Sequence, residues 1–463
     1  MDSNVRSSFS LLPRAKAQES ANFSVFLTRP CTRTPVFVNP EISKLWNLSD
    51  ALVQLTSSLF FLGWIVGGFL LSRMADRMGR RPTTLMTTAC IIASSVGQAS
   101  SVNYAMFCVM RVLNGAAMGG IASSSYVLWV EFQPANKRSM LTTMQTVCWA
   151  VLVCMLSPIA YACGDNWRVF TLVTNVPLVL GLFFFRLIHE SPRWLVSCGR
   201  YTDALAVLRA VAEWNGTELP DVRLASLPPA SAGRVSDLFH GDLRKRTIVM
   251  GVCWFTASLV YYGLSLSAGE LAGSIYVSNA LMSAVELPAY AVCLFVIDRY
   301  GRKLTQIAFY LWAGVFLVLL LFITEPGAKT ALALLGKFGI AGAFVLAYIY
   351  TSELFPTHVR AVAFGIMNVC SRSGGLLAPM VMSGDETRFG LLGFGVFALL
   401  SGGLTFLLPE TLNADLFAEK AAPVQQMLEA DEGDNASVVD DGSLSTDNES
   451  DEDAAAARPL HRV

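Results

Sequence analysis

The sequence predicts an all-α polytopic membrane protein, and two observations carry this prediction. Of the 463 residues, 53% are hydrophobic and only 15% are charged, against about 25% charged residues in an average soluble domain. Apolar stretches of about twenty residues recur along the chain, and each is long enough to cross a hydrocarbon core of about 30 Å. This composition argues strongly against a water-soluble globular domain.

Eleven apolar windows, bounded by charges or by Pro and Gly residues, are predicted to be transmembrane helices. They cover residues 51–71, 83–102, 104–130, 141–162, 167–188, 247–267, 273–297, 305–323, 331–351, 361–383 and 389–409. The first five form an N-terminal half over 51–188, and the last six form a C-terminal half over 247–409. Residues 1–50 are expected to be a non-membrane segment, and residues 189–246 a linker with short helices.

Basic residues set the expected orientation. If the connection over residues 73–81 is cytosolic, the connections on its side carry most of the Lys and Arg residues. Those on the other side carry only Arg168, Lys329 and Arg388. Because basic connections near span ends resist translocation, the linker and the tail over 410–463 are expected to be cytosolic.

The tail is expected to be disordered, because residues 429–453 hold 11 of the 35 acidic residues and few apolar ones. Such a segment cannot bury enough apolar surface to offset its ordering entropy. A kinase or an adaptor is a candidate partner, since hydroxyl side chains lie among the acids at Ser443, Ser445, Thr446 and Ser450. A solvated tail without a switch is the favoured interpretation.

The two halves share an internal repeat. At one offset of 222 residues, eight identities align, including Asp76 with Asp298 and Glu131 with Glu353. Matching places relative to the spans, with the same orientation, indicate a parallel repeat of two helical halves.

The repeated motif D-R-x-G-R-[RK] resembles the signature of the major facilitator superfamily. The blocks EFQPANKRS, HESPRWLVSCGR, WFTASLVYYGLSL, VELPAY, TSELFPTHVRAVAFG and LLPETL are similar to its organic cation, anion and carnitine transporter branch, the solute carrier 22-like proteins. The resemblance covers Trp46 to about Leu416. It implies the major facilitator superfamily fold and, as the family default, the plasma membrane.

The first helix of the resembled family is expected to be absent. The superfamily has six spans in each half, and the repeat places the missing one over residues 25–45, which contain Arg29, Arg33 and Lys44. A central Arg or Lys costs about 2.5–3.5 kcal/mol on insertion scales, so this segment is not expected to span the membrane. Residues 1–50 then resemble a remnant of the outer loop. A non-transporting truncated isoform, or a receptor-like protein of the same fold, stays an alternative function.

In the resembled superfamily, the repeated motifs clamp the two halves together on the cytosolic side when the cavity faces outward. A carboxylate at such a helix end can accept helix N-terminal N–H groups and pair with Arg. The corresponding residues here are Asp76, Arg77, Gly79, Arg80, Glu131 and Arg138, with Asp298, Arg299, Gly301, Arg302, Glu353 and Arg360 in the second half. The alternative is that they only set topology and loop shape.

Glu286 and Arg372 lie near the middle of their predicted spans, where ionisable side chains are costly and transporter sites form. Either the two neutralise each other, or Arg372 faces a cavity and binds a substrate carboxylate through two parallel hydrogen bonds. In the resembled branch the Arg372 position is acidic in cation carriers and Arg in anion and carnitine carriers, whereas Tyr290 resembles the carnitine type. Arg111 and Lys337 lie nearer the outer ends of their spans, from which either can snorkel outward.

Aromatic side chains supply the other predicted substrate contacts, as apolar walls or as faces for a quaternary ammonium. By resemblance, the family's aromatic cage corresponds to Tyr261, Tyr262, Phe344, Tyr348 and Trp149, and Trp254 lies on a cavity-lining span. Helix-packing core is the alternative for each of them. Two glycine pairs spaced by four residues, Gly63 with Gly67 and Gly115 with Gly119, are expected to be close-packing points between helices.

The expected function is transport of small organic ions by alternating access, either facilitative or by exchange. Organic anions or carnitine-like zwitterions are the favoured substrates, and organic cations are the alternative. The sequence contains no P-loop, GxSxG, HExxH or Cys/His metal spacing, so an enzyme, a cofactor, a metal or catalytic residues are not expected. The lipid bilayer and the small organic ion are the expected partners, nucleic acid is not one, and the oligomeric state is not set.

Overall fold

Helices are the regular secondary structure throughout the part of the chain that the computed structural model describes, as the sequence predicts. The described residues are 45–132, 138–164, 166–184, 188–217, 234–267, 275–382 and 387–412. They belong to one structural unit, Met1–Ala414. The predictions for residues 1–44, for the second unit Asp415–Val463 and for its acidic stretch fall outside the described residues.

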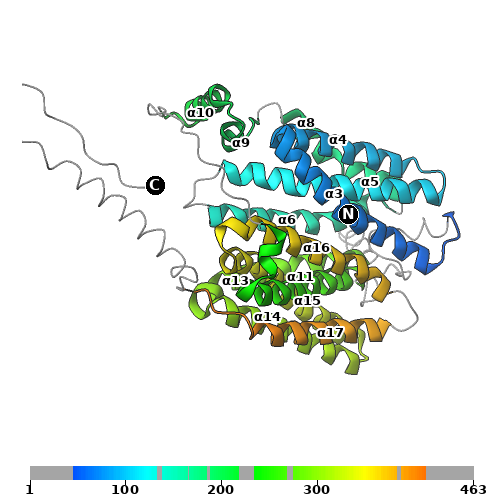
Figure 1. Ribbon diagram of the computed structural model, residues 1–463. Coiled ribbons are helices and arrows are strands. Elements are labelled where there is room, and N and C mark those ends of the chain that lie inside the picture. Colours follow the sequence, from blue (N-terminus) through cyan, green and yellow to red (C-terminus); the bar gives the residue numbers. More distant parts are fainter. Residues whose placement is uncertain are drawn as a thin grey trace, which may run out of the picture. The chain divides into compact units, whose positions relative to one another are not determined.

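The N-terminal half contains six described helices, coloured blue to green in Figure 1. They are α3 (Asp50–Met78), α4 (Arg80–Ala99), α5 (Tyr104–Glu131), α6 (Arg138–Ala162), α7 (Trp167–Val173) and α8 (Val176–Phe184). Gly79, at φ 106°, separates α3 from α4. Asn103 caps α5, because its side chain accepts a hydrogen bond from the backbone N–H of Met106 at 2.8 Å.

Short helices follow in the linker: α9 (Pro192–Ser197), α10 (Tyr201–Asn215) and the 3₁₀ helix η3 (Val235–Phe239). Ser191 caps α9 by accepting a hydrogen bond from the backbone N–H of Trp194 at 3.3 Å. Gly216 ends α10 in the left-handed conformation, which a glycine adopts without a steric penalty.

The C-terminal half runs from green to orange in Figure 1. Its helices are α11 (Gly241–Leu266), α12 (Ile275–Ala284), α13 (Glu286–Tyr300), α14 (Arg302–Leu319), η5 (Leu320–Phe322), α15 (Pro326–Leu354), α16 (Thr357–Val381) and α17 (Thr387–Thr405). Their core is tightly buried, and Trp254, Tyr310 and Phe394 expose essentially none of their surface.

Every predicted span falls on a helix or a helix pair. By length and composition, seven helices among the described residues can cross a membrane, and three further apolar helices are shorter. Two predicted spans, 167–188 and 273–297, are each broken into two helices. The breaks have a covalent cause, because Pro177 and Pro288 lie in the first turn of α8 and α13 and lack the N–H that would continue the preceding helix.

The glycine pairs act as the sequence predicts. Helices α3 and α5 pack backbone against backbone: a Cβ atom built on Gly63 would lie 2.2 Å from the carbonyl oxygen of Val112. One built on Gly115 would lie 2.0 Å from the carbonyl oxygen of Phe60. No larger residue fits at either point, so the prediction of close packing is confirmed.

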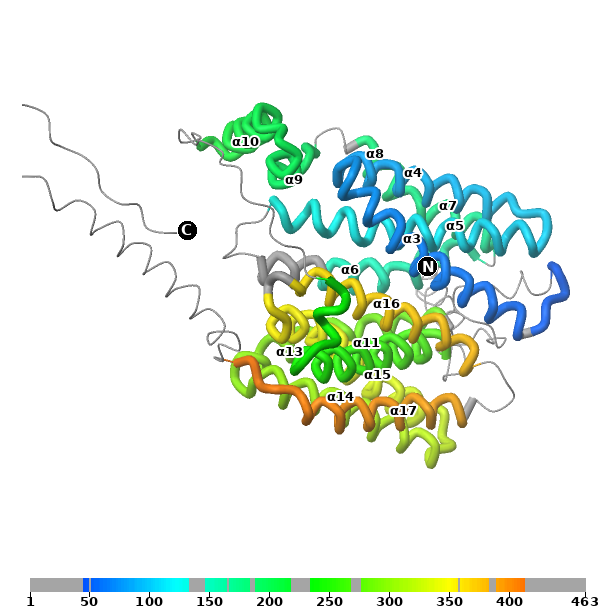
Figure 2. The backbone as a smooth tube through the Cα atoms, in the orientation of Figure 1, coloured from blue at the N-terminus to red at the C-terminus, as the bar shows by residue number. Residues whose placement is uncertain are grey.

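The two halves contact each other through α3 with α16 and through α6 with α12, and Figure 2 shows α3 and α16 side by side. The hydroxyl of Ser58 donates to the carbonyl of Leu376 at 2.9 Å. The side-chain amide of Asn279 donates to the hydroxyl of Ser157 at 2.8 Å. In the orientation that the basic residues predict, these contacts lie toward the outer ends of the helices.

Candidate functional site

Arg372 of α16 lies where the two halves meet. Its Nη1 donates a hydrogen bond to the hydroxyl of Tyr262 on α11 at 3.0 Å. Its Cζ lies 3.9 Å from the ring centroid of Trp64 on α3. The guanidinium therefore connects a helix of the N-terminal half with two helices of the C-terminal half.

One edge of the Arg372 guanidinium donates no hydrogen bond to any of the described residues. Its Nε is buried without a hydrogen-bond partner, and neither an acceptor for Nη2 nor a carboxylate paired with the side chain is found in that part of the chain. The N–H groups of Nε and Nη2 lie side by side, which is the geometry that grips a carboxylate with two parallel bonds. A half-buried cation with this edge unoccupied can bind an anion.

Glu286 does not pair with Arg372. Its Oε1 lies 3.3 Å from Nζ of Lys337, and both side chains are 1% exposed. Its Oε2 accepts a hydrogen bond from the hydroxyl of Tyr290 at 2.8 Å. The interpretation in which Glu286 and Arg372 neutralise each other is therefore wrong, and Lys337 does not snorkel outward. Since Glu286 begins α13, the negative end of the pair also lies at a helix N-terminus, where it is favoured.

Lys337 holds α11 next to the Arg372 contact. Its Nζ donates to the carbonyl of Tyr261 at 3.2 Å and to the hydroxyl of Ser265 at 2.8 Å. The same Nζ lies 3.1 Å from the ring centroid of Tyr261. Because Tyr262 follows Tyr261 directly, the buried ion pair fixes the stretch of α11 that carries the Arg372 partner.

Five of the predicted aromatic residues form one cluster, and Trp149 does not join it. The shortest ring separation is 4.3 Å, between Trp254 and Tyr348, and the other pairs are Trp254–Phe344, Tyr261–Tyr262, Tyr261–Phe344 and Phe344–Tyr348. Trp254 is fully buried and donates through Nε1 to the hydroxyl of Thr351 at 3.0 Å, whereas Tyr348 is 39% exposed. Tyr348 is thus the more accessible ring of this pair, and it packs against the buried Trp254.

Arg111, the other predicted intramembrane arginine, lies in the N-terminal half. Its Nη1 is 3.4 Å from Oε1 of Gln98, and its guanidinium lies 5.2 Å from the ring centroid of Phe60. These contacts are within its own half, so Arg111 does not share the site of Arg372.

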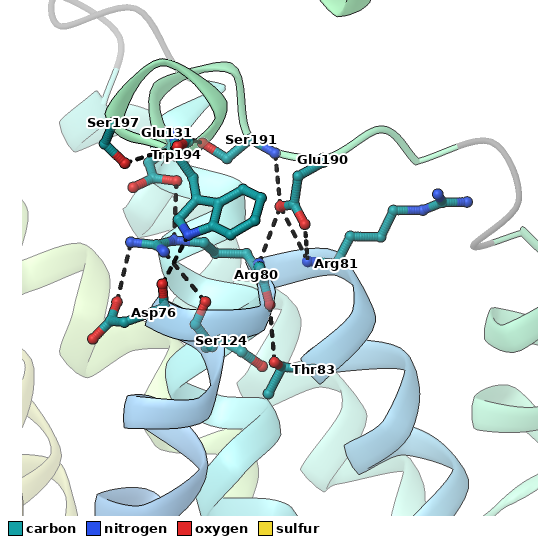
Figure 3. Close-up of polar contacts among 12 residues, drawn as sticks. Asp76, Arg80, Arg81, Thr83, Ser124, Glu131, Glu190, Ser191, Trp194 and Ser197 are labelled. Carbon is teal, nitrogen blue, oxygen red and sulfur yellow. Dashed lines mark hydrogen bonds and ion pairs between the residues drawn. The ribbon is translucent and has the colours of Figure 1, made fainter. Parts of the chain in front are cut away.

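The N-terminal copy of the repeated motif forms an ion-pair network, drawn in Figure 3. Nη2 of Arg80 lies 3.2 Å from the carboxylate of Asp76, and its Nε lies 3.6 Å from that of Glu131. The indole N–H of Trp194, in linker helix α9, donates to the backbone carbonyl of Asp76 at 2.9 Å. The linker is thus attached to the inner end of α3.

Glu190 caps the N-terminus of α4. Its carboxylate accepts hydrogen bonds from the backbone N–H groups of Arg80 at 3.1 Å and of Arg81 at 3.2 Å (Figure 3). These donors are among the N–H groups that a helix start leaves without a partner. The carboxylate can approach because Gly79 has no side chain: a Cβ atom there would lie 2.3 Å from Oε2 of Glu190.

The C-terminal copy repeats this geometry. Arg302 pairs with Asp298 at 3.4 Å and with Glu353 at 3.0 Å. The carboxylate of Glu410 accepts from the backbone N–H groups of Arg302 at 2.8 Å and of Lys303 at 3.1 Å. Gly301, at φ 88°, leaves the space that this carboxylate fills.

The surroundings of Glu410 set its protonation. Partial burial raises the pKa of its carboxyl group, but hydrogen bonds from the backbone N–H groups of Leu412, Arg302, Thr411 and Lys303 together outweigh burial. The pKa therefore lies below its ordinary value of 4.5, and the carboxylate is charged at neutral pH.

The remaining motif residues lie apart from these ion pairs. Nε of Arg360 donates to the carbonyl of Phe355 at 3.2 Å, and Glu353 pairs with Arg302 rather than with Arg360. Arg299 lies over the ring of Tyr300 at 5.8 Å, and no partner of Arg77 is found in the described part of the chain. Arg138 begins α6, and its side chain is outside what the structure describes.

Sequence reasoning missed Glu190, Glu410 and Trp64. The two glutamates follow the last span of each half, in the blocks HESP and PETL, so a signal was present. They are 220 residues apart, so the repeat at an offset of 222 residues does not align them. Nothing in the sequence distinguishes Trp64 from an ordinary packing aromatic in an apolar span.

Comparisons with known proteins agree with this architecture. A family model described as "Sugar (and other) transporter" matches residues 4–420. The protein named solute carrier family 22 member 15-like from Xenopus laevis is 36% identical over 391 residues, covering 81% of this chain and 80% of the relative. Organic anion transporter 3 from Rattus norvegicus is 32% identical over 390 residues, covering 80% and 73%. Solute carrier family 22 member 13 from Homo sapiens is 31% identical over 398 residues, covering 83% and 72%.

A solved structure supports the fold. The partially occluded inward-open conformation of the xylose transporter XylE from E. coli aligns with a TM-score of 0.63 at 19% identity. The alignment covers 83% of this chain and 92% of that chain. At this identity the likeness establishes the arrangement of helices and nothing about the cargo.

Proposed function

The chain belongs to solute carrier family 22, within the sugar and other transporter family, and from this premise we propose that it carries small organic anions or carnitine-like zwitterions by alternating access. It has the major facilitator superfamily fold, is a multi-pass integral membrane protein, and its relatives are transporters rather than enzymes. The plasma membrane is the proposed location.

The observation that carries the proposal is the unoccupied edge of Arg372. A half-buried guanidinium is a costly group in a membrane span unless an anion neutralises its charge. The hydroxyl of Tyr262 accepts a hydrogen bond from its Nη1, and the ring of Trp64 packs on one face. Its Nε has no hydrogen-bond partner among the described residues. A carboxylate bound there would neutralise the charge and fill the buried donor.

The neighbouring rings support a substrate with an organic body. Tyr348 is 39% exposed and packs on Trp254, close to Tyr261 and Phe344. An aromatic face can bind an aryl group or the quaternary ammonium of a zwitterion. The printed name of one relative, organic anion transporter 3, points to the same class.

Organic cations are less favoured by the same geometry. Glu286 is the buried carboxylate nearest to the aromatic cluster in the described part of the chain, and Lys337 neutralises it at 3.3 Å. Arg372 then gives the site a net positive charge, which repels a simple cation.

The contacts between the halves support a carrier facing the cytosol. The described cross-half hydrogen bonds lie toward the outer ends. The carboxylates of Asp76 and Asp298, expected at the inner ends, are 69% and 78% exposed. Rocking of the halves about the middle would close these inner ends and open the outer ones, as alternating access requires.

The full chain in proteoliposomes gives the decisive experiment, with uptake of labelled benzoate, carnitine and tetraethylammonium. Arg372→Asp should abolish benzoate uptake and favour tetraethylammonium, because the charge at the site changes sign. The matched control is Arg73→Asp, which reverses an exposed arginine over the ring of Phe69 on α3. Unchanged selectivity in Arg372→Asp overturns the proposed substrate class. Binding of benzoate without uptake by the wild type would favour the receptor-like alternative.

A further inference from the structure

Resting on the proposed function, we propose that Trp64 is a positioning residue for the substrate carboxylate. Its indole face would set the plane of the Arg372 guanidinium, so that the edge formed by Nε and Nη2 is presented to the ligand. The N-terminal half would thereby take part in anion recognition although the cation belongs to the C-terminal half.

Two contacts restrict the guanidinium in complementary ways. The ring of Trp64, 3.9 Å from Cζ, packs on its face and prevents tilting. The hydrogen bond from Nη1 to the hydroxyl of Tyr262 prevents rotation within that plane. A planar group held on one face and at one corner keeps its opposite edge in a defined direction. Stacking does not consume an N–H donor, so the ring and a carboxylate can hold the cation together.

Trp64 is itself fixed by its own half. A Cβ atom on Gly119 of α5 would lie 2.4 Å from the carbonyl oxygen of Trp64 and 3.0 Å from its ring Cδ1. The ring of Phe60 packs edge-on against Trp64, with centroids 5.6 Å apart. The indole therefore has little freedom to follow Arg372, and the arginine must adapt to the ring.

A second aromatic contact across the halves supports the same arrangement. The ring of Phe61 on α3 packs against Tyr262 with centroids 4.7 Å apart. Phe61 also occupies the space beside Gly375 of α16, where a Cβ atom would lie 2.8 Å from it. Of the two groups that restrict the guanidinium, Trp64 belongs to α3 and Tyr262 of α11 packs against α3 through Phe61. A rigid-body movement of the N-terminal half would therefore alter the direction in which Arg372 offers its free edge.

Fluorinated tryptophans at position 64 test the inference without altering the shape of the residue. Site-specific incorporation of mono-, di- and trifluorotryptophan in the full chain weakens the negative ring face in steps. KM for labelled benzoate in proteoliposomes should rise with each fluorine, to about three- to tenfold in total, from the usual strength of a cation–π contact. The maximal rate should change much less, because the outer and inner contacts between the halves are untouched.

The same series at Trp129 of α5, which is 48% exposed, is the matched control and should leave KM constant. Trp64→Phe should raise KM less than Trp64→Leu, since only Phe keeps a ring face. A flat KM across the fluorinated series overturns the role of Trp64, whatever Trp64→Leu does to folding. If Arg372→Asp changes selectivity while this series is flat, only the Trp64 inference fails; if Arg372→Asp changes nothing, the proposed substrate class fails first.

Discussion

Glu190 and Glu410 occupy equivalent positions in the two halves. Each carboxylate accepts the first two backbone N–H groups of the helix that follows a D-R-x-G-R motif. Each carboxylate also fills the space beside a glycine with positive φ. The end of each half is thus attached to the start of the helix that begins at the last Arg of the motif in the same half.

Removal of either carboxylate should destabilise its half. Glu190→Ala and Glu410→Ala should each lower the free energy of unfolding by about 1 kcal/mol, the usual loss when a helix start loses its capping acceptor. Thermal unfolding of the purified protein in detergent measures the change. Glu213→Ala, in linker helix α10, is the control and should unfold like the wild type; equal midpoints for all three variants would contradict the capping role.

Acidification should remove the contribution of Glu410. Its pKa is lowered in the folded state, so its stabilising effect is fully present above the unfolded pKa of about 4.5. The effect is lost as the pH falls through the lower folded value. The midpoint difference between the wild type and Glu410→Gln should therefore be constant near neutral pH, begin to shrink as the pH falls toward the unfolded pKa of about 4.5, and vanish once the pH is below the lowered folded pKa. A difference that grows on acidification would give the opposite sign and exclude this account.

Substitution of the two motif glycines should also destabilise the protein. Gly79 and Gly301 combine positive φ with an extended ψ, a region almost reserved for glycine, and a Cβ atom would meet the capping carboxylate. Gly79→Ala and Gly301→Ala should each cost about 1–3 kcal/mol. Gly365→Ala within α16, where nothing lies within 4 Å of the added atom, should change stability in the opposite direction by about 0.5–1 kcal/mol. The same sign for all three in thermal unfolding would rule out backbone strain as the cause.

Breaking the buried ion pair should be costly, and removing both charges less so. Glu286→Gln leaves Lys337 charged and unpaired at 1% exposure, which should cost about 3–5 kcal/mol. Glu286→Gln with Lys337→Met should recover part of this loss, because no isolated charge remains. A double-mutant cycle of unfolding measurements tests the coupling; strictly additive losses would show that the two side chains act independently.

Asp76 and Arg360 should govern turnover rather than stability. Asp76→Asn and Arg360→Ala should slow uptake several-fold at unchanged surface expression, because the outward-facing state would lose a contact between the halves. Asp76 is 69% exposed here, so its midpoint of unfolding should stay close to that of the wild type. Asp203→Asn, which breaks an exposed linker ion pair with Arg200, is the control. Wild-type turnover in both motif variants would leave these residues with a topological role only.

The sequence predicts helix positions well because apolar length and charge are read directly from it. It also predicts the contact between Gly63 and α5, since pairs of small residues have few other uses in a membrane helix. It does not predict the breaks at Pro177 and Pro288, because hydropathy windows average over a single missing N–H group.

The site is harder to predict because the sequence gives depth in the membrane but not direction around a helix. Glu286 and Arg372 have similar predicted depth, yet Lys337, predicted nearer the outer face, is the partner of Glu286. Gly119 of α5 admits the backbone of Trp64, and the Trp64 ring meets Arg372 from the other half. Such pairings depend on how three or four helices pack, which a single span does not encode.

The close backbone packing of α3 against α5 makes Trp64 a fixed reference point. With backbone touching backbone at Gly63 and Gly115, α3 has no room to slide along its neighbour. Any change in separation between a reporter on α3 and one on α16 therefore records displacement of an entire half. The distance between a pair of spectroscopic labels on these two helices would therefore report the relative movement of the two halves during transport, because the halves themselves do not deform.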